Sequence, residues 1–360
     1  MVRLLNNTQI EELLTMKDCI DVLEQAYLDL ADNKAVNVRR VDVYVPTAEK
    51  ETYYVYKTMS GIVPRYDVVA LRINSDIYHW PLVEGIPRKE IVPAASGKRY
   101  VRFVLLFSCT TGEPLAIFPD GYMQKMRVGA TNGLGIKYIA REDSEVIGLL
   151  GTGWQASAQL EAACVARKVK EVRVFSPTKS NREDFARRMA EKAGVEIVPV
   201  DKPELCFEGC DIVITATNSM SPVYDAEWAE KGMHLTSLKR QEVDERVFDY
   251  CSMIVLNSRS HIRPIDHVIG NRDDIPELSL SRGQWFDIEE KMPKKTVDLA
   301  DVVAGKVQVR KSPDDITYFM NNLGLGMQFA AVGSVILRKA IEHNVGQDIP
   351  VDWFLQDAHS

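Results

Sequence analysis

The sequence predicts an α/β protein, and four consecutive segments between residues 146 and 175 support that prediction. A short apolar run, 146–150, follows charged residues. A glycine-rich turn, 151–153, comes next, and an apolar-periodic stretch, 156–169, follows it. A second apolar run, 171–175, closes the unit. This succession is typical of the strand, tight turn, helix and parallel strand of a Rossmann βαβ unit.

The glycine turn predicts a dinucleotide site. Gly151 and Gly153 take the first two positions of the G-x-G-x-x-G/A fingerprint, and Ala156 takes the third. Gly151 allows the sharp turn, and Gly153 lets the backbone approach a pyrophosphate that faces the helix amides. The alternative is a glycine turn that merely joins a strand and a helix. The cofactor-binding candidates are Gly151, Thr152, Gly153, Trp154, Gln155 and Ala156.

The residues after the second strand favour NADP(H), with NAD(H) as the less favoured cofactor. An acidic residue about 20 positions after the glycines usually binds the 2′-hydroxyl of NAD. No acid lies between Phe175 and Arg182. Hydroxyls and cations, which suit a phosphate, stand there instead: Ser176, Thr178, Lys179 and Arg182. The alternative is that Lys179 and Arg182 are solvated residues at a helix start.

Composition and charge are those of an ordinary globular protein. The 360 residues suggest two domains, with 46% hydrophobic and 26% charged residues. The net charge of −7 argues against nucleic-acid binding, and no apolar run has the length of a membrane span. The six cysteines and six histidines show no metal-ligand spacing. We therefore expect a cytoplasmic protein with free thiols and no metal.

Before residue 145 the pattern predicts a mixed β-sheet with helices on it. Residues 8–33 fit two helical stretches broken near 15–18. Residues 76–100, rich in proline and glycine, are expected to form an irregular flap. A helix from about Tyr122 to Ala140 carries Arg127 and several small residues, which suggests close packing. Strands are expected at 39–46, 52–59, 66–74, 100–108 and 114–118.

After residue 145 the Rossmann pattern continues. Further strands are expected at 194–200, 211–216, 232–238 and 253–256. Such folds place ligands in the loops at the carboxyl ends of their strands, so Thr217, Asn218 and Ser219 join the cofactor-binding candidates. After residue 300 the pattern turns helical, with segments at 301–304, 317–322 and 328–343.

Several stretches together resemble the ornithine cyclodeaminase/μ-crystallin family. They occur in the family's order over most of the chain: 111–116 with 120–121, 127–130, 151–156, 211–217 with 222–223, 232–235 and 322–328. The resemblance implies a Rossmann domain, residues 136–317, inserted into a mixed α+β substrate-binding and dimerisation domain, residues 1–135 plus 318–360. It also implies a homodimer. The family includes ornithine cyclodeaminase, alanine dehydrogenase, imino-acid reductases and μ-crystallin, which binds NADPH.

The resemblance also implies the residues that bind substrate. The family has an Arg on an early strand, which Arg40 matches best and Arg39 next. A family Lys falls on Arg72, and a family Arg falls on Arg127. Guanidinium groups bind carboxylates in bidentate fashion, so three arginines suit a small carboxylate substrate. Their alternatives are a solvated strand edge for Arg40 and a structural ion pair for Arg127.

Two departures from the family pattern stand out. The family's catalytic Asp does not align, because the loop after 232–238 is shortened; Gln241, Glu242 and Asp244 are candidates, and each is equally well a surface residue. Near the end, Asn322 and Phe329 replace a family Ser and Asp. Asn322 is included among the cofactor-binding candidates.

The leading hypothesis is an NADPH-dependent reductase of a small imino or 2-oxo acid, or an amino-acid dehydrogenase in reverse. Arg40, Arg72 and Arg127 would bind the carboxylate. Arg72, Arg127 and Lys57 are the catalytic candidates, with Lys57 or a water as the proton donor; Lys57 is equally well a surface lysine. The alternatives are an ornithine cyclodeaminase-type lyase and a μ-crystallin-like NADPH-dependent ligand-binding protein.

Overall fold

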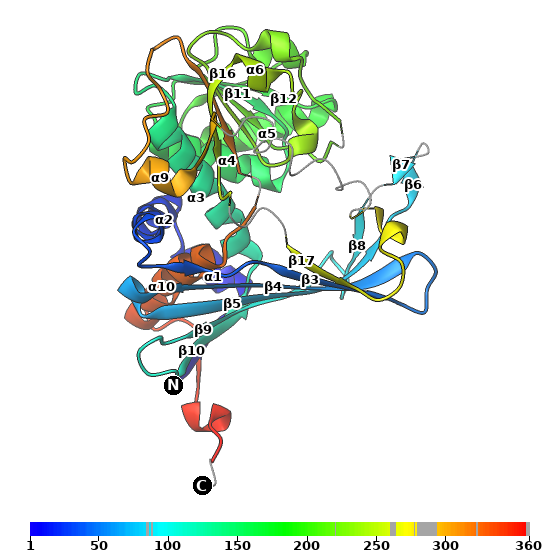
Figure 1. Cartoon of the computed structure of the whole chain (residues 1–360), viewed down its shortest axis with the longest axis vertical. Helices are drawn as coiled ribbons and strands as arrows, with labels where there is room; N and C mark the ends of the chain where they lie inside the picture. The colour runs from blue at the N-terminus through cyan, green and yellow to red at the C-terminus, as the bar shows by residue number, and fades with distance from the viewer. Residues whose placement is uncertain are drawn as a thin grey trace.

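The computed structural model describes residues 1–83, 86–87, 89–219, 221–259, 264–276, 278, 294–321 and 323–357. Over these ranges the chain forms two lobes, each built on a large sheet, with helices between them (Figure 1). The sheet domain contains the first and last strands of the chain, β1 and β20. The second lobe is the Rossmann domain. The predicted fold class is therefore confirmed.

The Rossmann domain is a parallel sheet whose described part has eight strands in the order β13-β12-β11-β14-β15-β19-β16-β18. Neighbouring strands run parallel throughout. The chain moves outward from β11 through β12 and β13 and then returns on the other side through β14, so the order reverses at β11. The strands are β11 (Val146–Leu150), β12 (Glu171–Phe175), β13 (Glu196–Pro199), β14 (Ile212–Thr215), β15 (His234–Ser237), β16 (Cys251–Leu256), β18 (Thr296–Asp298) and β19 (Ile316–Met320).

Helices and short turns connect these strands. The helices are α4 (Trp154–Ala166), α5 (Lys179–Ala193), α6 (Val247–Tyr250) and α9 (Leu299–Val303). The 3-10 turns are η2 (Pro203–Cys206), η3 (Ala226–Trp228) and η4 (Arg240–Glu242). The helical pattern expected at 317–322 is wrong, because 317–320 belong to β19, which is hydrogen-bonded between β15 and β16. The expected domain boundary at 317/318 falls inside β19, and the chain leaves the Rossmann sheet after Met320.

The sheet domain contains a mixed sheet with ten described strands, whose main path is β17-β3-β4-β5-β9-β10-β1-β20. Two more strands, β2 and β8, pair with β4 and β5, and β6 pairs with β7 in a separate ribbon. The strands are β1 (Val2–Leu4), β2 (Val36–Asn37), β3 (Val41–Pro46), β4 (Thr52–Val63), β5 (Val68–His79), β6 (Leu82–Val83), β7 (Ile86–Pro87), β8 (Glu90–Val92), β9 (Val101–Phe107), β10 (Pro114–Pro119), β17 (Ile265–Val268) and β20 (Gln347–Ile349).

The long hairpin of β4 and β5 forms the middle of this sheet. Buried and half-buried residues alternate along both strands, so one face of the hairpin points into the molecule. The flap expected at 76–100 is wrong in part, because β5 continues to His79 and β8 pairs with its end. The aromatic side chains of Tyr78 and Trp80 pack edge to face there, which extends strand structure into this stretch.

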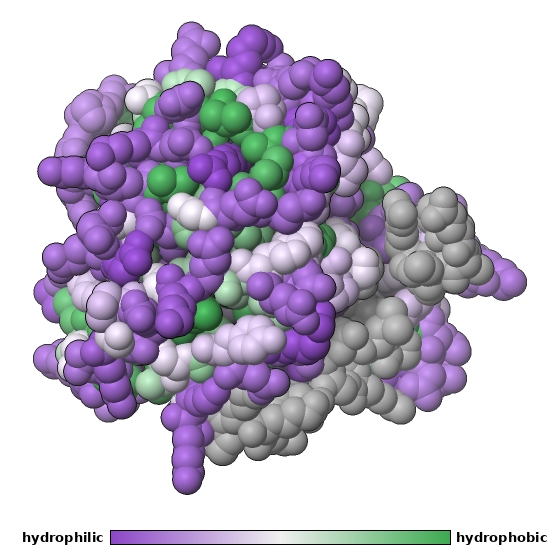
Figure 2. All heavy atoms as spheres, turned by 90° about the horizontal axis from the view of Figure 1, so that it is seen from above, coloured by the Kyte–Doolittle hydropathy of each residue, from purple (hydrophilic) through white to green (hydrophobic). Residues whose placement is uncertain are grey.

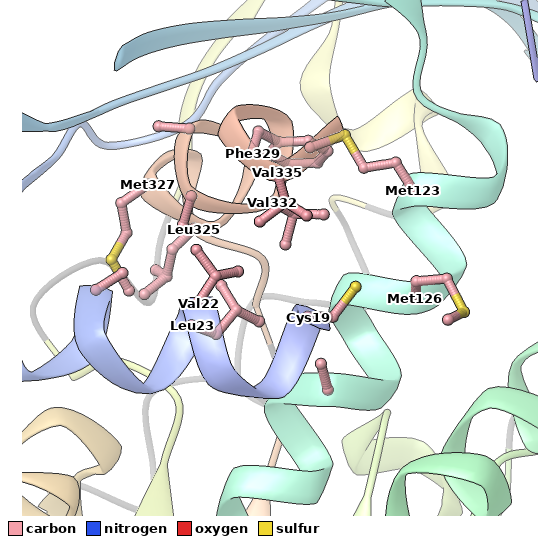
Figure 3. Packing of buried hydrophobic residues seen from close by; sticks show 14 of the residues in the cluster. Cys19, Val22, Leu23, Met123, Met126, Leu325, Met327, Phe329, Val332 and Val335 are labelled. Atoms are coloured by element: carbon pink, nitrogen blue, oxygen red, sulfur yellow. The ribbon is translucent and has the colours of Figure 1, made fainter. Parts of the chain in front are cut away.

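Helix α10 (Gly326–Glu342) packs on β4 and β5 at the inner face of the sheet, and three further helices pack against it: α1 (Asn7–Leu13), α2 (Met16–Ala31) and α3 (Gly121–Ile139). Helices α2, α3 and α10 pack their apolar side chains into one cluster (Figure 3). Phe329 and Val332 of α10 meet Cys19 and Leu23 of α2 in this cluster, and all four are buried. Burying a side chain of this size contributes about 2 kcal/mol, so this layer holds α10 against the sheet.

Glycines let α3 pack closely against the Rossmann domain, as its small residues suggested. A Cβ on Gly129 would lie 2.6 Å from the Ala158 carbonyl oxygen of α4. A Cβ on Gly135 would lie 2.5 Å from the Phe319 ring of β19. Helix α3 therefore contacts both α4 and β19, and it links the two lobes.

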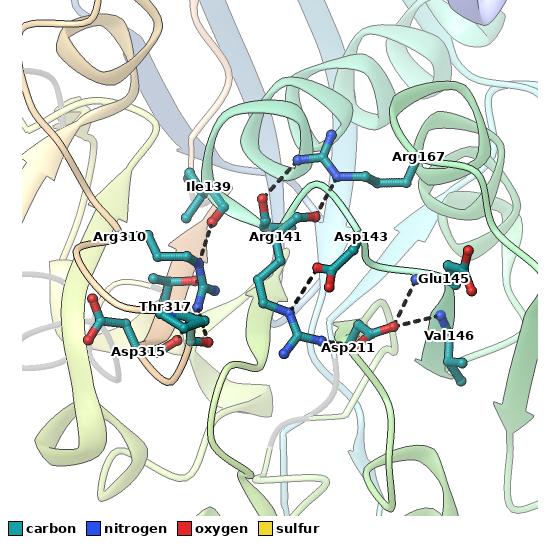
Figure 4. A network of polar contacts seen from close by, with 12 residues as sticks. Ile139, Arg141, Asp143, Glu145, Val146, Arg167, Asp211, Arg310, Asp315 and Thr317 are labelled. Carbon is teal, nitrogen blue, oxygen red and sulfur yellow. Dashed lines mark hydrogen bonds and ion pairs between the residues drawn. The ribbon is translucent and has the colours of Figure 1, made fainter.

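A polar network anchors the carboxyl end of α3 to the Rossmann sheet (Figure 4). Asp211 accepts hydrogen bonds from the Glu145 and Val146 amides at 2.8 and 3.0 Å, and it pairs with Arg141. Arg167 donates to the Arg141 carbonyl oxygen at 2.8 Å. These contacts lie at the amino ends of β11 and β14, on the edge opposite the glycine turn.

The surface seen from above is mostly hydrophilic, and hydrophobic residues reach it in limited patches (Figure 2). Within the described ranges, no helix has the length and apolar character needed to cross a membrane. The same ranges contain no group of histidine, cysteine or acidic residues that could hold a metal ion.

Candidate active site

The glycine turn has the geometry that a pyrophosphate site needs. Gly151 has a φ of 117°, and a Cβ there would lie 2.3 Å from the Ala216 carbonyl oxygen, so only glycine fits. A Cβ on Gly153 would meet no atom within 4 Å, which leaves open space above that backbone. Helix α4 begins at Trp154 without a side-chain cap, so its first amides can face an anion. Gln155 keeps a buried Oε1 without a partner among the described residues. The turn therefore fits a dinucleotide.

The loop after β14 lies beside this turn and is held by a buried carboxylate. The Thr217 amide and hydroxyl donate to Glu242 at 2.6 and 2.7 Å, and Thr215 donates at 3.1 Å. Burial raises the pKa of Glu242, whereas the bonds from Thr217 and the charge of Lys239 oppose that shift. Lys239 donates to the Ser219 carbonyl oxygen at 3.1 Å. Asn218 is exposed at the tip of the loop.

These contacts assign structural roles to two candidates for the family's Asp. Glu242 is fully buried, so it is not a surface residue, and it anchors the loop. Asp244 accepts from the Ala226 amide at 3.1 Å and pairs with Arg246 at 2.6 Å. Gln241 lies within η4 and is half-buried.

The end of β12 offers hydroxyls and one exposed cation. Thr178 is the residue before α5 and makes no capping bond with its side chain. Lys179 is exposed, with its Nζ 3.7 Å from Glu183. Arg182 is buried instead, because it donates to the Ser176 carbonyl oxygen at 3.0 Å and pairs with Asp201. Of the two predicted cations, Lys179 alone extends from the surface.

Two of the predicted arginines flank Met59 on the inner face of the sheet. Met59 pairs with Arg72 across β4 and β5, and Val41 pairs with Thr58, which places Arg40 beside Met59 on the other side. Arg72 donates to Asp120 at 2.6 Å. Arg40 forms two bonds to Asp42, both 2.8 Å. The sheet register therefore aligns Arg40, Met59 and Arg72 in one row, and Arg39 turns away to the Pro264 carbonyl oxygen at 3.2 Å.

The third arginine approaches this row from α3. Arg127 is 4% exposed and donates to the amide oxygens of Gln124 and Gln328, at 2.6 and 2.7 Å. Its guanidinium carbon lies 4.6 Å from the centre of the Phe329 ring, and that of Arg72 lies 5.5 Å from the same centre. Burial, and then the charge of Arg72, lower the pKa of Arg127 to about 9. No described carboxylate forms an ion pair with it.

Lys57 lies one step further along the sheet from Met59. It is buried, so the alternative of a surface lysine is wrong. Its Nζ lies 3.3 Å from Asp42 and over the rings of Tyr44 and Tyr78, at 5.5 and 5.2 Å. Asn74 is the cross-strand neighbour of Lys57 and is also buried.

Arg127 lies close to the carboxyl edge of the Rossmann sheet. Asn321, directly after β19, donates its amide N–H to Ser237 at the end of β15 (3.0 Å) and its side chain to Val128 of α3 (2.9 Å). A Cβ on Gly324 would lie 2.5 Å from Arg127 Nη1. The chain that leaves the Rossmann sheet after β19 therefore runs directly past Arg127. Asn322 lies outside the described residues.

Sequence reasoning missed the residues that hold these cations in place. Asp42, Asp120 and Gln328 each bond one of the arginines. Asp120 and Gln328 stand within stretches that resemble the family, which was the available signal. Asp42 and Asn74 stand two residues after Arg40 and Arg72, so the alternation of side chains along a strand was the available signal, and it was overlooked.

A parallel Rossmann sheet with this glycine turn, together with a domain that places three arginines near one another, is the architecture of a dinucleotide-dependent oxidoreductase. The chain belongs to the ornithine cyclodeaminase/mu-crystallin family, whose model matches residues 2–344. Alanine dehydrogenase of Archaeoglobus fulgidus is 29% identical over 68% of this chain and 72% of its own. A delta(1)-pyrroline-2-carboxylate reductase of Bacillus cereus is 27% identical over 70% and 75%. The structure of the Thermococcus litoralis delta(1)-pyrroline-2-carboxylate reductase with NADH and L-proline has 26% identity, a TM-score of 0.76 and coverage of 97% and 100%.

Proposed function

We propose that this protein is an NADP(H)-dependent reductase of a small imino acid or 2-oxo acid, and an amino-acid dehydrogenase in reverse. The observation that carries the proposal is Arg127, a buried guanidinium whose only hydrogen-bond partners among the described residues are neutral amide oxygens. A buried charge without a counter-ion is costly, so a ligand carboxylate is its natural partner. The names of the relatives, reductases of pyrroline-2-carboxylate and alanine dehydrogenase, support the same substrate class.

The residues of the pocket divide the work of holding such a substrate. Arg127 and Arg72 accept the carboxylate, while Asp120 and Gln328 fix the direction of their guanidinium groups. Arg40 completes the row from the other side of Met59. Phe329 covers the two guanidinium faces and keeps water from them. The bound nicotinamide supplies the hydride, and the protein supplies orientation and electrostatics.

Lys57 or an ordered water carries the proton that accompanies reduction of a neutral substrate. The position of Lys57 supports this role, because its side chain lies on the same face of the sheet as Arg72, one row further along. Its contacts with Asp42 and two aromatic rings hold the ammonium group in place. Replacement of Lys57 by methionine would slow turnover of a 2-oxo acid without ammonia and leave cofactor affinity unchanged.

The dinucleotide lies across the switch point of the sheet. The amides after Gly153 would hold its pyrophosphate, and the loop of Thr217, Asn218 and Ser219 would hold its nicotinamide half. The absence of an acid between Phe175 and Arg182 favours NADP(H), with Ser176, Thr178 and Lys179 around the 2′-phosphate. NADH and NAD are the cofactors named for two related structures, which makes parallel assays with NADH necessary.

A homodimer is the proposed assembly. The outward face of the long hairpin bears Ile62, Leu71 and Ile73, which are half-buried, and Phe103 of the adjacent strand is 43% exposed. An archaeal alanine dehydrogenase of the same fold is described as a dimer. Light scattering on the purified chain would give twice the 40.6 kDa chain mass.

Nicotinamide absorbance tests the proposed activity. NADPH and NADH would be run in parallel with pyruvate, glyoxylate, phenylpyruvate, oxaloacetate and cyclic imines, each with and without ammonia or methylamine. Net oxidation of NADPH that disappears in Arg127→Met supports the proposal. Release of proline and ammonia from ornithine with catalytic cofactor would instead establish a cyclodeaminase, and ligand binding without any turnover would establish a binding protein.

A further inference from the structure

Asn74 presents a buried hydrogen-bond acceptor that the rest of the chain leaves unused. It lies on β5 two residues after Arg72, so its side chain is on the same inner face, about 6.6 Å further along the strand. The residue is 5% exposed. Its Oδ1 is fully buried and has no partner among the described residues. Buried side-chain oxygens in native proteins are nearly always bonded, so this one requires an explanation.

The neighbours of Asn74 on this face are turned toward other groups. Arg72 donates to Asp120 at 2.6 Å, and Lys57 lies 3.3 Å from Asp42 with its ammonium group over two tyrosine rings. Arg102, the cross-strand partner on the other side, lies 3.3 Å from Asp76. The amide oxygen therefore stands between cations that are held away from it, which leaves it available for a donor from a ligand.

The position of Asn74 beside the proposed carboxylate site identifies that donor. In an imino acid, the nitrogen is two bonds from the carboxylate carbon, and the protonated nitrogen is a charged N–H donor. In a 2-oxo acid, the same position carries an oxygen that can only accept, so it would repel another acceptor. We propose that Asn74 Oδ1 accepts a hydrogen bond from the protonated imine nitrogen of the substrate and thereby selects imino acids over 2-oxo acids.

This assignment rests on the proposed function, because the arginine pocket must hold the carboxylate for the nitrogen to reach Asn74. The chemistry balances without a further acid. Hydride from the reduced nicotinamide forms a C–H bond at the imine carbon, and the C=N π pair moves to nitrogen and neutralises its charge. The product is the amine together with the oxidised, cationic nicotinamide. Asn74 therefore holds the nitrogen during hydride transfer and exchanges no proton.

Three variants test the proposal. Asn74→Leu keeps the volume and removes the acceptor, Asn74→Asp keeps an oxygen acceptor, and Ser75→Ala changes the adjacent residue on the opposite face as a control. Each is assayed for kcat/KM with a cyclic imine and with a 2-oxo acid lacking amine, and NADPH binding by fluorescence reports the folded site. Hydrogen bonds to charged groups of this kind predict a roughly 10- to 100-fold loss on the imine for Asn74→Leu. The loss on the 2-oxo acid should be absent or reversed.

The outcomes separate this proposal from the function on which it depends. The proposal is supported if Asn74→Asp keeps the preference for the imine and Asn74→Leu loses it. Full imine turnover in Asn74→Leu, or an equal loss on both substrates, would overturn the assignment of Asn74 while leaving the reductase in place. Absence of turnover on every imine and every 2-oxo acid in the unaltered protein would overturn both proposals together. A preference of the unaltered protein for the 2-oxo acid would mean that the amide presents Nδ2 instead of Oδ1, and would overturn the role proposed here.

Discussion

Arg127 and Phe329 stack on one another although they come from helices about 200 positions apart in the sequence, with the guanidinium carbon 4.6 Å from the ring centre. The contact leaves one edge of the guanidinium to the amide oxygens of Gln124 and Gln328. An arginine oriented by a ring and two amides, and not by a carboxylate, is prepared for an anionic ligand.

Replacement of Arg127 by methionine is expected to raise KM for the carboxylate substrate and lower kcat/KM by roughly 10- to 150-fold, the value of a bond to a charged group. Arg127→Lys keeps the charge but not the two-pronged geometry, so it should recover only part of the loss. Steady-state kinetics with the preferred substrate measures both. Arg338→Met, on the exposed side of α10, is the matched control. Unchanged kinetics in Arg127→Met would remove this residue from the site.

Substitution of the two glycines of the turn should have different effects, on stability at Gly151 and on cofactor affinity at Gly153. Gly151→Ala brings a Cβ to 2.3 Å from a carbonyl oxygen at a positive φ, so stability should fall by roughly 3 kcal/mol or more. A Cβ at position 153 meets no protein atom, so the melting temperature of Gly153→Val should stay near that of the unaltered chain. The valine side chain would occupy the space next to the pyrophosphate, so cofactor affinity should drop by roughly tenfold or more. Thermal unfolding with and without NADPH separates the two. Equal cofactor affinity in Gly153→Val would place the pyrophosphate elsewhere.

Cofactor choice should depend on Lys179. Lys179→Ala is expected to raise KM for NADPH roughly 3- to 30-fold and to leave KM for NADH unchanged, because only the 2′-phosphate gains from the cation. Lys202→Ala removes another exposed lysine of the Rossmann domain and serves as the control. A preference for NADH in the unaltered protein would contradict the choice of NADP(H).

Stability should fall as the solution becomes acidic because of His234. Burial, followed by the charges of Arg310 and Arg167, lowers the pKa of this histidine to about 3. The unfolded chain takes up the proton near pH 6.5 and the folded chain does not, so the stabilisation is present above pH 6.5 and is lost as the pH falls toward 3. The slope is at most about 1.4 kcal/mol per pH unit. Urea unfolding between pH 7 and 4.5 measures it, and His234→Asn should flatten the curve. An equal slope in that variant would assign the acid sensitivity to other groups.

The network at the end of α3 should contribute mainly to stability. Asp211→Ala leaves the Glu145 and Val146 amides without an acceptor and removes a partner of Arg141, so unfolding free energy should fall by roughly 2–3 kcal/mol. Asp143→Ala removes an exposed partner of the same arginine and should cost under about 1 kcal/mol. Denaturant unfolding compares the two. Equal losses of unfolding free energy in the two variants would mean that the hydrogen bonds from the Glu145 and Val146 amides do not stabilise the fold.

Local patterns were enough to predict the Rossmann unit, because its strands, its glycine turn and α4 follow each other in the sequence. They were not enough for β19, whose place between β15 and β16 depends on pairing partners more than 60 residues away. Resemblance gave Arg40, Arg72 and Arg127 as a set. The groups that orient them are set by register and packing: Asp42 lies opposite Lys57, and Gln328 reaches Arg127 from α10. The alternation along β5 was enough to place Asn74 on the face of Arg72, but its unused acceptor is seen only once its neighbours on the sheet are known.

Helix α3 carries Arg127 in its first half, and its carboxyl end is followed by Arg141, which is fastened to the first strands of the nucleotide lobe. Arg127 is therefore joined to the nucleotide lobe through α3, and its contacts with Gln328 and Phe329 join it to α10 and the sheet below. A substrate carboxylate bound by Arg127 and Arg72 would connect the nucleotide lobe to the sheet domain. Its binding would set the distance between the nicotinamide carbon that gives the hydride and the substrate carbon that accepts it. A ligand without that carboxylate would not fix the distance between the two reacting carbons, even if it made every other contact with the site.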